Sequence, residues 1–270
     1  MGRPASAQNS AQPCRAPWRN RFPSAADGVT MGVMTHAPIR FGNIMLGPGA
    51  RVVGTVSQAA TLAQLATGTE RNCDIVEIRL DLIGSDTPHW IEQAKAIEGR
   101  GMPVIVTIRL VEEGGQWRQA DASRLPLFES ALRQLTAADI ELRSPLVEKV
   151  SKLAYQRRRP LIVSYHDFKK TPSRDELKKV MMGAANYGTI VKIVTQTNTE
   201  ADVATLRTVF QGTCTAALCV MGMGPLGPQT RTEFPKLGSC LTYGYLDAPV
   251  APGQVAARDL MQELGGQHAG

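Results

Sequence analysis

The sequence predicts an α/β protein built as a (β/α)8 barrel of the TIM type, with a short N-terminal hairpin closing the lower end of the barrel. From residue 39 onward, eight short apolar runs alternate with helical patterns, which is typical of parallel βαβ units. Roughly 230 residues for eight units fits such a barrel, which typically takes about 250 residues. A doubly wound open sheet is the alternative. No GxGxxG segment follows the first long apolar run, so nothing favours a dinucleotide-binding version of that sheet.

The individual elements follow in chain order from these patterns. Apolar residues at 39–41 and 44–46 flank Gly42 and Asn43, which indicates a small hairpin. Strands are expected near residues 51–57, 74–82, 103–110, 138–143, 160–166, 189–195, 215–221 and 240–245. Helices are expected between them, with clear helical patterns at residues 121–135, 145–158, 173–187 and 200–210, and a last helix after residues 251–254.

The first 36 residues are predicted to be an extension separate from a single catalytic barrel domain at residues 37–270. They are rich in Ala, Pro, Ser and Arg and show no helical or strand periodicity. The apolar core of a secretory signal is absent from them, and no amphipathic face accompanies their transit-peptide-like composition. We interpret them as disordered, or as the result of a start codon placed too early, with Met31 or Met34 as the true start.

Composition and charge exclude several classes of function. No apolar run approaches the roughly 18 residues that a membrane-spanning helix needs. The net charge of +6 is too small and too scattered to suggest a nucleic-acid surface, although it is compatible with a small anionic substrate. The five cysteines form no CxxC pair and only four histidines are present. This predicts free thiols in a reducing compartment, the cytoplasm, and no metal site.

Polar residues recur on one face of several predicted strands. In residues 76–82 apolar side chains occupy the even positions, so Glu77, Arg79 and Asp81 share the other face. Unpaired charges are costly to bury, so inside a barrel these side chains must pair or meet a ligand. An edge strand with a solvated face is the alternative. The next three strands sort in the same way and suggest a shared polar interior, through Thr107, Arg109, Asp139, Glu141, Arg143, Ser164 and His166.

Lys192 and His166 are the clearest candidates for chemistry. Lys192 lies in the apolar run at residues 190–194, where burial disfavours the ammonium form and favours a neutral amine able to attack a ketone and form an imine. A structural lysine paired with Glu77, Glu141 or another inward carboxylate is the alternative. His166 ends an apolar strand and is a candidate general acid–base, or else a satisfied structural histidine.

Two loops after the last strands complete the candidate site. Residues 223–227 are rich in glycine and lead to Arg231. Backbone amides there could approach an anion, and the guanidinium could bind a carboxylate with two hydrogen bonds. Residues 251–254 could place the amide of Gln254 over the mouth of the barrel. Each loop has a simpler interpretation as a turn or a helix cap.

From about Ile39 to Leu264, the chain resembles the type I 3-dehydroquinate dehydratases, the Schiff-base enzymes of the shikimate and quinate pathways. The diagnostic resemblance is Asp139-Ile140-Glu141-Leu142 followed after eighteen residues by residues 161–167, Leu-Ile-Val-Ser-Tyr-His-Asp. Further motifs fall in the family's order: Glu77-x-Arg79, Thr107-x-Arg109, Glu112-Glu113-Gly114-Gly115, Thr171-Pro172, Val191-Lys192-Ile193 and Ala251-Pro252-Gly253-Gln254.

The resemblance implies a role for nine residues. Lys192 matches the imine-forming lysine, His166 the general acid–base, and Glu113 the carboxylate that orients the histidine. The groups implied to bind substrate are Glu77, Arg79 and Arg109 for the ring hydroxyls, Arg231 for the carboxylate, Gln254 on the closing loop, and Thr55 at a small hydroxyl position. Two positions depart from the family pattern: Val250 stands where the family has serine, and Thr230-Arg231 replaces Ser-Arg.

The implied reaction is the dehydration of 3-dehydroquinate to 3-dehydroshikimate, with no organic cofactor or metal. The implied assembly is a homodimer. A class I aldolase-like Schiff-base enzyme and a non-catalytic, ligand-sensing barrel are the alternative functions. The residues do not separate a biosynthetic role from a quinate-degrading one.

Overall fold

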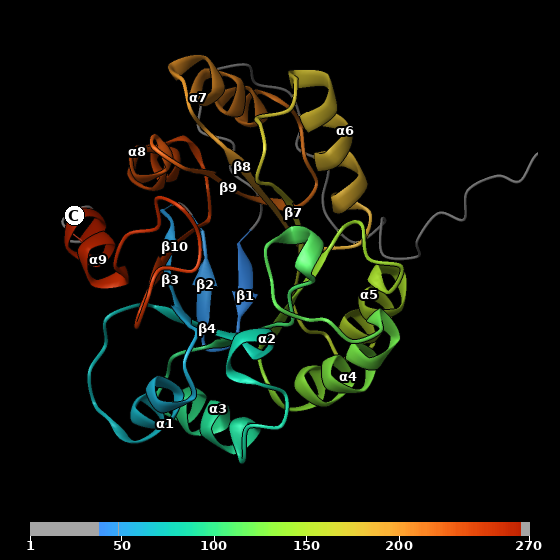
Figure 1. Cartoon of the computed structure of the whole chain (residues 1–270), viewed down its shortest axis with the longest axis vertical. Coiled ribbons are helices and arrows are strands. Elements are labelled where there is room, and N and C mark those ends of the chain that lie inside the picture. The colour runs from blue at the N-terminus through green and yellow to red at the C-terminus, as the bar shows by residue number, and fades with distance from the viewer. Residues whose placement is uncertain (1–37, 48, 266–270) are drawn as a thin grey trace, which may run out of the picture. The chain divides into compact units, whose positions relative to one another are not determined.

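The computed structural model describes residues 38–47 and 49–265, and its centre is an eight-stranded parallel barrel (Figure 1). The predicted extension at residues 1–36 lies outside the described residues. The barrel strands are β3 (Arg51–Val56), β4 (Ile75–Arg79), β5 (Val104–Thr107), β6 (Ala137–Glu141), β7 (Leu161–Asp167), β8 (Ile190–Gln196), β9 (Ala217–Met223) and β10 (Leu241–Tyr245). The sheet runs in the order β10-β3-β4-β5-β6-β7-β8-β9.

The first and last strands of this order meet and nearly close the barrel. Ser239, just before β10, forms a parallel bridge with Leu218 of β9. The amide of Cys240 donates to the carbonyl of Leu218 at 2.7 Å. The predicted (β/α)8 barrel is therefore confirmed, and the doubly wound open sheet is wrong.

Helices lie between successive strands and cover the outside of the barrel (Figure 1). They are α1 (Ala59–Thr67), α2 (Leu80–Ile83), α3 (Trp90–Gly99), α4 (Leu125–Gln134), α5 (Val147–Gln156), α6 (Arg174–Ala185), α7 (Glu200–Arg207), α8 (Gly227–Glu233) and α9 (Ala257–Gly265). Short 3-10 segments are η1 (Val111–Glu113), η2 (Asp121–Arg124), η3 (Thr208–Gln211) and η4 (Phe234–Leu237). None of the helices in the described residues is long and apolar enough to cross a membrane.

Local sequence explains why helices begin and end where they do. A capping box opens α6, because Ser173 accepts from the amide of Glu176 and the carboxylate of Glu176 accepts from the amide of Ser173. Thr199 and Asp202 make the same reciprocal pair at α7. The helix predicted at residues 121–135 is a 3-10 turn, η2, followed by α4 with proline in its first turn.

The predicted hairpin is present at the end of the barrel where the strands begin. Strands β1 (Ile39–Phe41) and β2 (Ile44–Leu46) pair in antiparallel fashion around Gly42, whose φ of +62° suits glycine. Phe41 and Leu46 are fully buried against the first residues of the barrel strands. The hairpin thus covers the lower end of the barrel.

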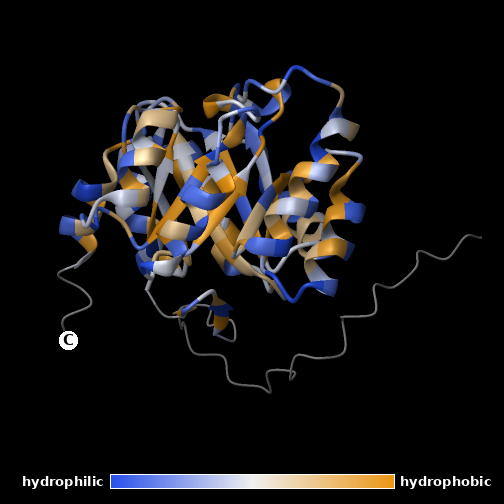
Figure 2. Cartoon of the chain, turned by 90° about the horizontal axis from the view of Figure 1, so that it is seen from below, coloured by the Kyte–Doolittle hydropathy of each residue, from blue (hydrophilic) through white to orange (hydrophobic). Residues whose placement is uncertain are grey.

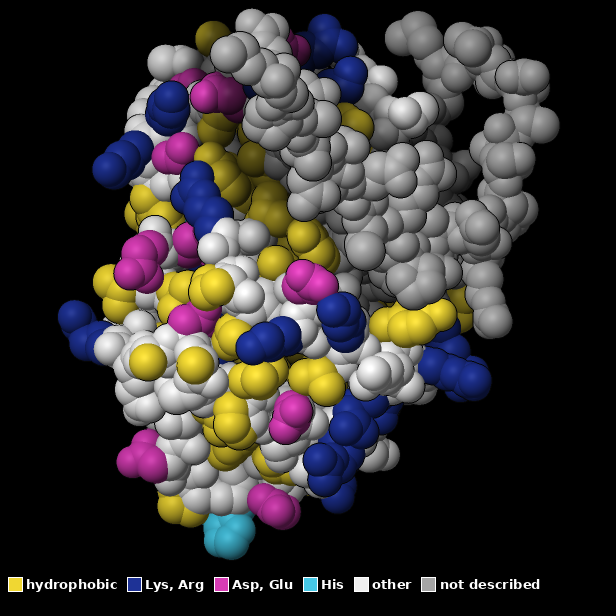
Figure 3. Space-filling model, turned by 90° about the vertical axis from the view of Figure 1, so that its right-hand side faces the viewer, with side chains coloured by type: hydrophobic (Ala, Val, Ile, Leu, Met, Phe, Trp, Pro, Cys, Tyr) yellow, Lys and Arg dark blue, Asp and Glu magenta, His cyan; other side chains and the backbone are white. Residues whose placement is uncertain are grey.

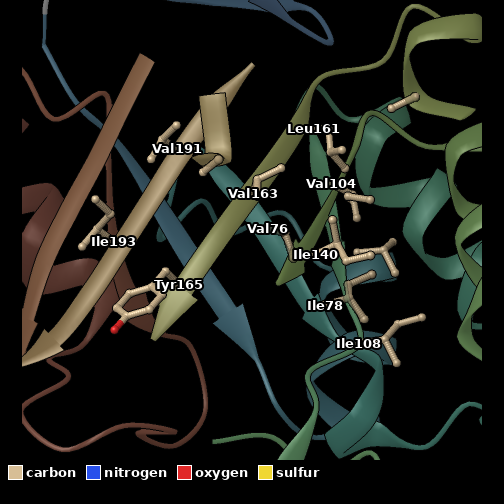
Figure 4. Close-up of a cluster of buried hydrophobic side chains, with 14 of the residues drawn as sticks. Val76, Ile78, Val104, Ile108, Ile140, Leu161, Val163, Tyr165, Val191 and Ile193 are labelled. Carbon is tan, nitrogen blue, oxygen red and sulfur yellow. The ribbon is translucent and has the colours of Figure 1, made fainter. Parts of the chain in front are cut away.

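Strand parity divides the core into two layers. Apolar residues of one parity face the helices and form the larger cluster, and Figure 4 labels ten residues of this cluster, including Val76, Ile78 and Val163. Residues of the other parity point into the barrel and form the second cluster, which includes Ile75, Ile105 and Ile162. In Figure 2 the strands are coloured largely hydrophobic, whereas the helices carry both colours. This two-sided burial is why the strands are nearly continuous apolar runs.

Three predicted strands extend too far, and two inward assignments are therefore wrong. Strand β4 ends at Arg79, and Asp81 belongs to α2, where its carboxylate pairs with Arg79 instead of continuing a strand face. Strand β6 ends at Glu141, and Arg143 places its guanidinium 4.4 Å from the centre of the Tyr165 ring on the helix side of the sheet. Strand β5 ends at Thr107, before Arg109.

The surface carries mixed charges. On the face shown in Figure 3, Lys and Arg side chains are interspersed with Asp, Glu and hydrophobic side chains. This distribution agrees with the scattered charge of the sequence.

Candidate active site

A pocket lies at the ends of the strands where they run into the helices, which is the face that carries the active site in (β/α)8 barrels. It brings together all nine residues that the sequence nominated: Thr55, Glu77, Arg79, Arg109, Glu113, His166, Lys192, Arg231 and Gln254. They come from all parts of the barrel, because the parallel strands all end at this face. The remaining lining residues are mostly apolar or glycine, with Tyr243 and Val250 among them.

Lys192 lies in the middle of β8 with its side chain only 5% exposed. Its Nζ atom is 3.0 Å from Asp139 Oδ2, 3.6 Å from Glu77 Oε1 and 3.9 Å from the centre of the Tyr243 ring. Of the two interpretations that the sequence left open, the ion pair is present. Because adjacent carboxylates favour the ammonium form, the apolar neighbours along the strand do not by themselves decide the charge of this amine.

Asp139 is the counter-charge at the centre of the site. Its Oδ1 atom accepts hydrogen bonds from Arg109 Nη2 at 2.7 Å and from Ser164 Oγ at 2.6 Å, while Oδ2 accepts from Lys192. Burial alone would raise the pKa of Asp139, but the charges of Arg109 and Lys192 hold it well below its usual range. A carboxylate that stays ionised here fixes both cations in place.

His166 and Glu113 form a hydrogen-bonded pair on one side of the pocket. Glu113 Oε2 accepts from the backbone amide of His166 at 3.0 Å and lies 3.0 Å from the ring Nδ1 atom. Burial, and then the charges of Arg109 and Lys192, lower the pKa of His166 well below its ordinary value. The imidazole is therefore neutral near pH 7, and donation of Nδ1–H to Glu113 leaves the lone pair on Nε2. A neutral base of this kind can remove a proton from a bound molecule.

The pKa of Glu113 is also displaced. Burial, together with the negative charge of Glu141, raises it to about 7, although Arg109 acts in the opposite direction. Its second oxygen, Oε1, is buried with no hydrogen-bond partner among the described residues. All hydrogen bonds of the Glu113 carboxylate among the described residues are therefore made with His166, through Oε2.

Glu77 and Arg79 enter the pocket with partners already in place. Glu77 accepts from the hydroxyls of Thr55 at 2.9 Å and Thr107 at 2.8 Å, one on each carboxylate oxygen. Arg79 donates to both oxygens of Asp81, at 2.9 and 2.8 Å. Each keeps further hydrogen-bonding capacity, so the polar wall can still receive the hydroxyl groups of a ligand.

Arg231 is a buried cation with no acidic partner among the described residues. It lies on α8, is 2% exposed, and donates to the carbonyls of Tyr243 at 2.8 Å and Gly253 at 3.3 Å. Burial lowers the pKa of its guanidinium to about 10. A buried cation that lacks a counter-charge favours the binding of an anion.

The glycine-rich loop before Arg231 does not present free amides to an anion, contrary to the sequence prediction. Gly224 donates to the carbonyl of Pro252 and Gly227 donates to that of Gly224, each at 3.0 Å. The φ of Gly224 is +79°, and a Cβ on Gly253 would overlap the Gly224 carbonyl. These glycines bring two loops into close contact, which leaves the guanidinium as the anion-binding group.

Gln254 reaches the pocket from the loop after β10. Its Nε2 atom lies 3.5 Å from Thr55 Oγ1, and its Oε1 atom accepts from the amide of Val250 at 2.8 Å. Val250 lines the pocket with an aliphatic side chain, so this position offers no hydrogen bond to a ligand.

Sequence reasoning gave no role to five residues that line the pocket: Phe168, Val194, Met221, Met223 and Tyr243. Strand parity placed Asp139 in the polar interior but did not single it out as the carboxylate that pairs with Lys192. Strand parity could also have nominated Tyr243, which occupies an inward position. The apolar character of the two methionines carries no such signal. In the described part of the chain, no cluster of three or more His, Cys, Asp or Glu side chains is arranged to hold a metal ion.

Fold and pocket together define a (β/α)8-barrel enzyme with its site at the carboxyl ends of the strands. The family model for type I 3-dehydroquinase matches residues 52–269, and the chain belongs to this family. The 3-dehydroquinate dehydratase of Methanocella arvoryzae is 36% identical over 191 residues, which cover 71% of this chain and 86% of that protein. The enzyme of Methanococcoides burtonii is 32% identical over 231 residues, covering 84% and 98%.

Solved structures agree with the assignment of the fold. The 3-dehydroquinate dehydratase of Geobacillus kaustophilus superposes with a TM-score of 0.77 at 24% identity, covering 87% of this chain and 97% of that one. The enzyme of Aquifex aeolicus gives a TM-score of 0.70 at 29% identity, covering 80% and 97%.

Proposed function

We propose that this chain dehydrates 3-dehydroquinate to 3-dehydroshikimate through an imine on Lys192, with His166 as general acid and base. The observation that carries the proposal is the presence in one pocket of a buried lysine, a neutral histidine held by Glu113, and a buried arginine with no carboxylate partner in the described part of the chain. Family membership supports the substrate.

Substrate binding would be governed by Arg231, the buried cation in the lining of the pocket. The carboxylate of 3-dehydroquinate supplies the counter-charge that Arg231 lacks. Gln254 lies on the adjacent loop, and Glu77, Arg79 and Arg109 form the polar wall for the ring hydroxyls. This placement leaves the C3 ketone for Lys192.

The covalent step begins with a proton leaving the ammonium group. His166 is neutral and can accept that proton, which frees the lysine to attack the ketone carbon and give a carbinolamine. His166 then returns its proton to the carbinolamine hydroxyl, which leaves as water; a protonated imine remains and His166 is again neutral. Asp139 remains ionised beside the nitrogen throughout and compensates the charge of that imine.

Elimination then follows from the electron demand of the imine. His166 removes the acidified C2 proton to give a neutral enamine, which expels the C1 hydroxyl. That hydroxyl leaves as water with a proton from His166, and hydrolysis of the imine consumes one water and releases the product. The net change is the loss of one water molecule, and every proton returns to its starting group.

Borohydride reduction in the presence of 3-dehydroquinate tests the mechanism. Mass spectrometry should locate the reduced adduct on Lys192, and Lys192→Ala should abolish both adduct and turnover. Lys179→Ala, an exposed lysine on α6, is the matched control and should retain both. His166→Ala should lose about 10²- to 10⁴-fold in turnover while some adduct still forms. Turnover without any adduct on Lys192 would overturn the mechanism.

The products of the same reaction separate the alternatives. Aldol cleavage changes the number of carbon atoms in the product, whereas dehydration does not. Binding without any turnover would favour a ligand-sensing barrel. The homodimer that the family resemblance implies is a further proposal, which light scattering on the purified chain tests.

A further inference from the structure

The buried Arg124 is the largest fully buried side chain of the described residues and lies outside the pocket. It sits in η2, at the end of the loop that joins β5 to α4. Its Nη1 atom donates to Glu141 Oε2 at 2.7 Å and also to the carbonyl of Ile108, and its Nη2 atom donates to Ser144 Oγ at 3.0 Å. Its Nε atom donates to Asp121 Oδ1 at 2.6 Å. One guanidinium therefore ties together three segments of the chain.

Glu141 carries this connection to the other end of the same loop. Its Oε1 atom accepts from the backbone amide of Leu110 at 2.9 Å and lies 3.3 Å from Arg109 Nη1. The carboxylate thus binds the end of the loop through Arg124 and its beginning through Leu110. Residues 109–124 form a loop whose two ends are fixed on a single buried carboxylate, which is fixed in turn by two arginines.

The loop carries the carboxylate that contacts His166. Three backbone hydrogen bonds connect the first part of the loop to its fixed beginning. The amides of Glu113 and Gly115 donate to the carbonyl of Leu110 at 3.1 and 2.9 Å, and the amide of Trp117 donates to the carbonyl of Arg109 at 3.1 Å. Glu113 Oε1 has no partner among the described residues, so the position of the carboxylate depends on the backbone of this loop and on the hydrogen bonds of Oε2 with His166. Displacement of Leu110 would therefore move Glu113 relative to His166.

We propose that Arg124 is a positioning residue for the His166–Glu113 pair, acting through Glu141 and the loop 109–124. Without Arg124, the Glu141 carboxylate loses its best-placed buried counter-charge and is drawn toward Arg109, the remaining cation at 3.3 Å. That movement takes the acceptor away from Leu110. The loop then no longer holds the Glu113 carboxylate against the His166 ring. Without that acceptor, the imidazole is no longer restricted to the tautomer with its proton on Nδ1.

This inference rests on the proposed function only for its effect on turnover. The variant is Arg124→Met, and the matched control is Arg118→Met, because Arg118 is an exposed arginine in the same loop. We expect Arg124→Met to lower kcat by roughly 30- to 100-fold, the size of effect that a misplaced catalytic group produces, with KM changed less than 5-fold. The borohydride adduct should still form, since Lys192 is untouched.

A spectroscopic measurement makes the test independent of the reaction. The ring ¹⁵N shifts of His166, measured without substrate, should show the Nδ1–H tautomer in wild type and Arg118→Met, and a mixture of tautomers in Arg124→Met. Arg124→Lys keeps the charge but cannot reach the same set of acceptors, so it should fall between the two. An unchanged tautomer, with kcat within 3-fold of the control, would overturn the proposal.

A double variant covers the case in which Arg124→Met does not fold. Arg124→Met with Glu141→Gln leaves no unpaired carboxylate at this position, and it should fold. It should still show the tautomer mixture, because the end of the loop has also lost the hydrogen bonds from Arg124 to Asp121, to the Ile108 carbonyl and to Ser144. A single Nδ1–H tautomer in this folded variant would equally refute the role of Arg124. A wild type without dehydration or adduct would refute the proposed function alone, since the tautomer result stands by itself.

Discussion

Replacement of Arg231 by methionine should leave the stability of the fold nearly unchanged and impair binding. The guanidinium is buried without an acidic partner among the described residues, and burial lowers its pKa to about 10 from the ordinary value of an arginine. This difference corresponds to about 3 kcal/mol by which the folded state disfavours the charge. A guanidinium remains charged below about pH 10, so the cost is present throughout the neutral range.

Two hydrogen bonds offset that cost. Arg231 donates to the carbonyls of Tyr243 and Gly253, and each hydrogen bond to a charged group contributes about 1.5–3 kcal/mol before the remaining acceptors find other donors. The two contributions are of similar size, so we expect Arg231→Met to change the free energy of unfolding by less than about 1 kcal/mol. In a chain of this size that corresponds to a shift in Tm of less than about 4 °C.

The same change should weaken binding of the anionic substrate. Loss of the only cation proposed for the carboxylate should lower kcat/KM by at least about 100-fold, as expected when one partner of a buried charge pair is removed. Urea denaturation gives the stability, steady-state kinetics give kcat/KM, and Arg258→Met on the exposed face of α9 is the control. A variant that is less stable than wild type by more than about 1 kcal/mol, or that keeps its kcat/KM, would refute the reasoning.

Three further outcomes follow from the site. Burial raises the pKa of Glu113 to about 7. Because protonation of Glu113 removes the hydrogen-bond acceptor of His166, kcat/KM should fall about tenfold per pH unit below that value. Glu113→Gln should remove this acidic decline from the pH profile, and a wild-type profile without the decline would contradict the prediction. Asp139→Asn removes the nearest counter-charge of two buried cations, Arg109 and Lys192, and leaves them only the more distant Glu141 and Glu77. Urea denaturation should therefore show a loss of up to about 3–5 kcal/mol, and an unchanged midpoint would show that the pairing is not stabilising. A Cβ on Gly115 would overlap a backbone carbonyl across the loop, so Gly115→Ala should lower kcat at least about tenfold, whereas Gly99→Ala, in open space, should leave it unchanged.

The alternation of apolar runs with helical patterns was sufficient to predict the barrel, and side-chain alternation within the strands predicted much of its polar interior. Residues of one parity in a strand share a face whatever the strand packs against, so Glu77 and Asp139 had to point the same way as the other inward residues. Parallel strands all end at one face of the barrel. For this reason all nine nominated residues, which are scattered over two hundred positions, meet in one pocket.

The ends of the strands were not predictable in this way. Arg79 and Asp81 alternate with apolar residues as a strand would, but their ion pair lies across the start of α2. Arg143 alternates similarly and instead contacts Tyr165 outside the barrel. Alternation of apolar and polar residues shows which face each side chain of a strand occupies, but it does not show at which residue the strand ends.

Within the strands, the sequence by itself determined which side chains face inward, because there that property depends only on neighbours along the chain. The tertiary structure alone decided which of them pair: Lys192 with Asp139, Arg124 with Glu141, and Arg231 with no carboxylate among the described residues. Pairing depends on distances between residues far apart in the chain, and in a low-dielectric interior those distances govern the charge that each group carries.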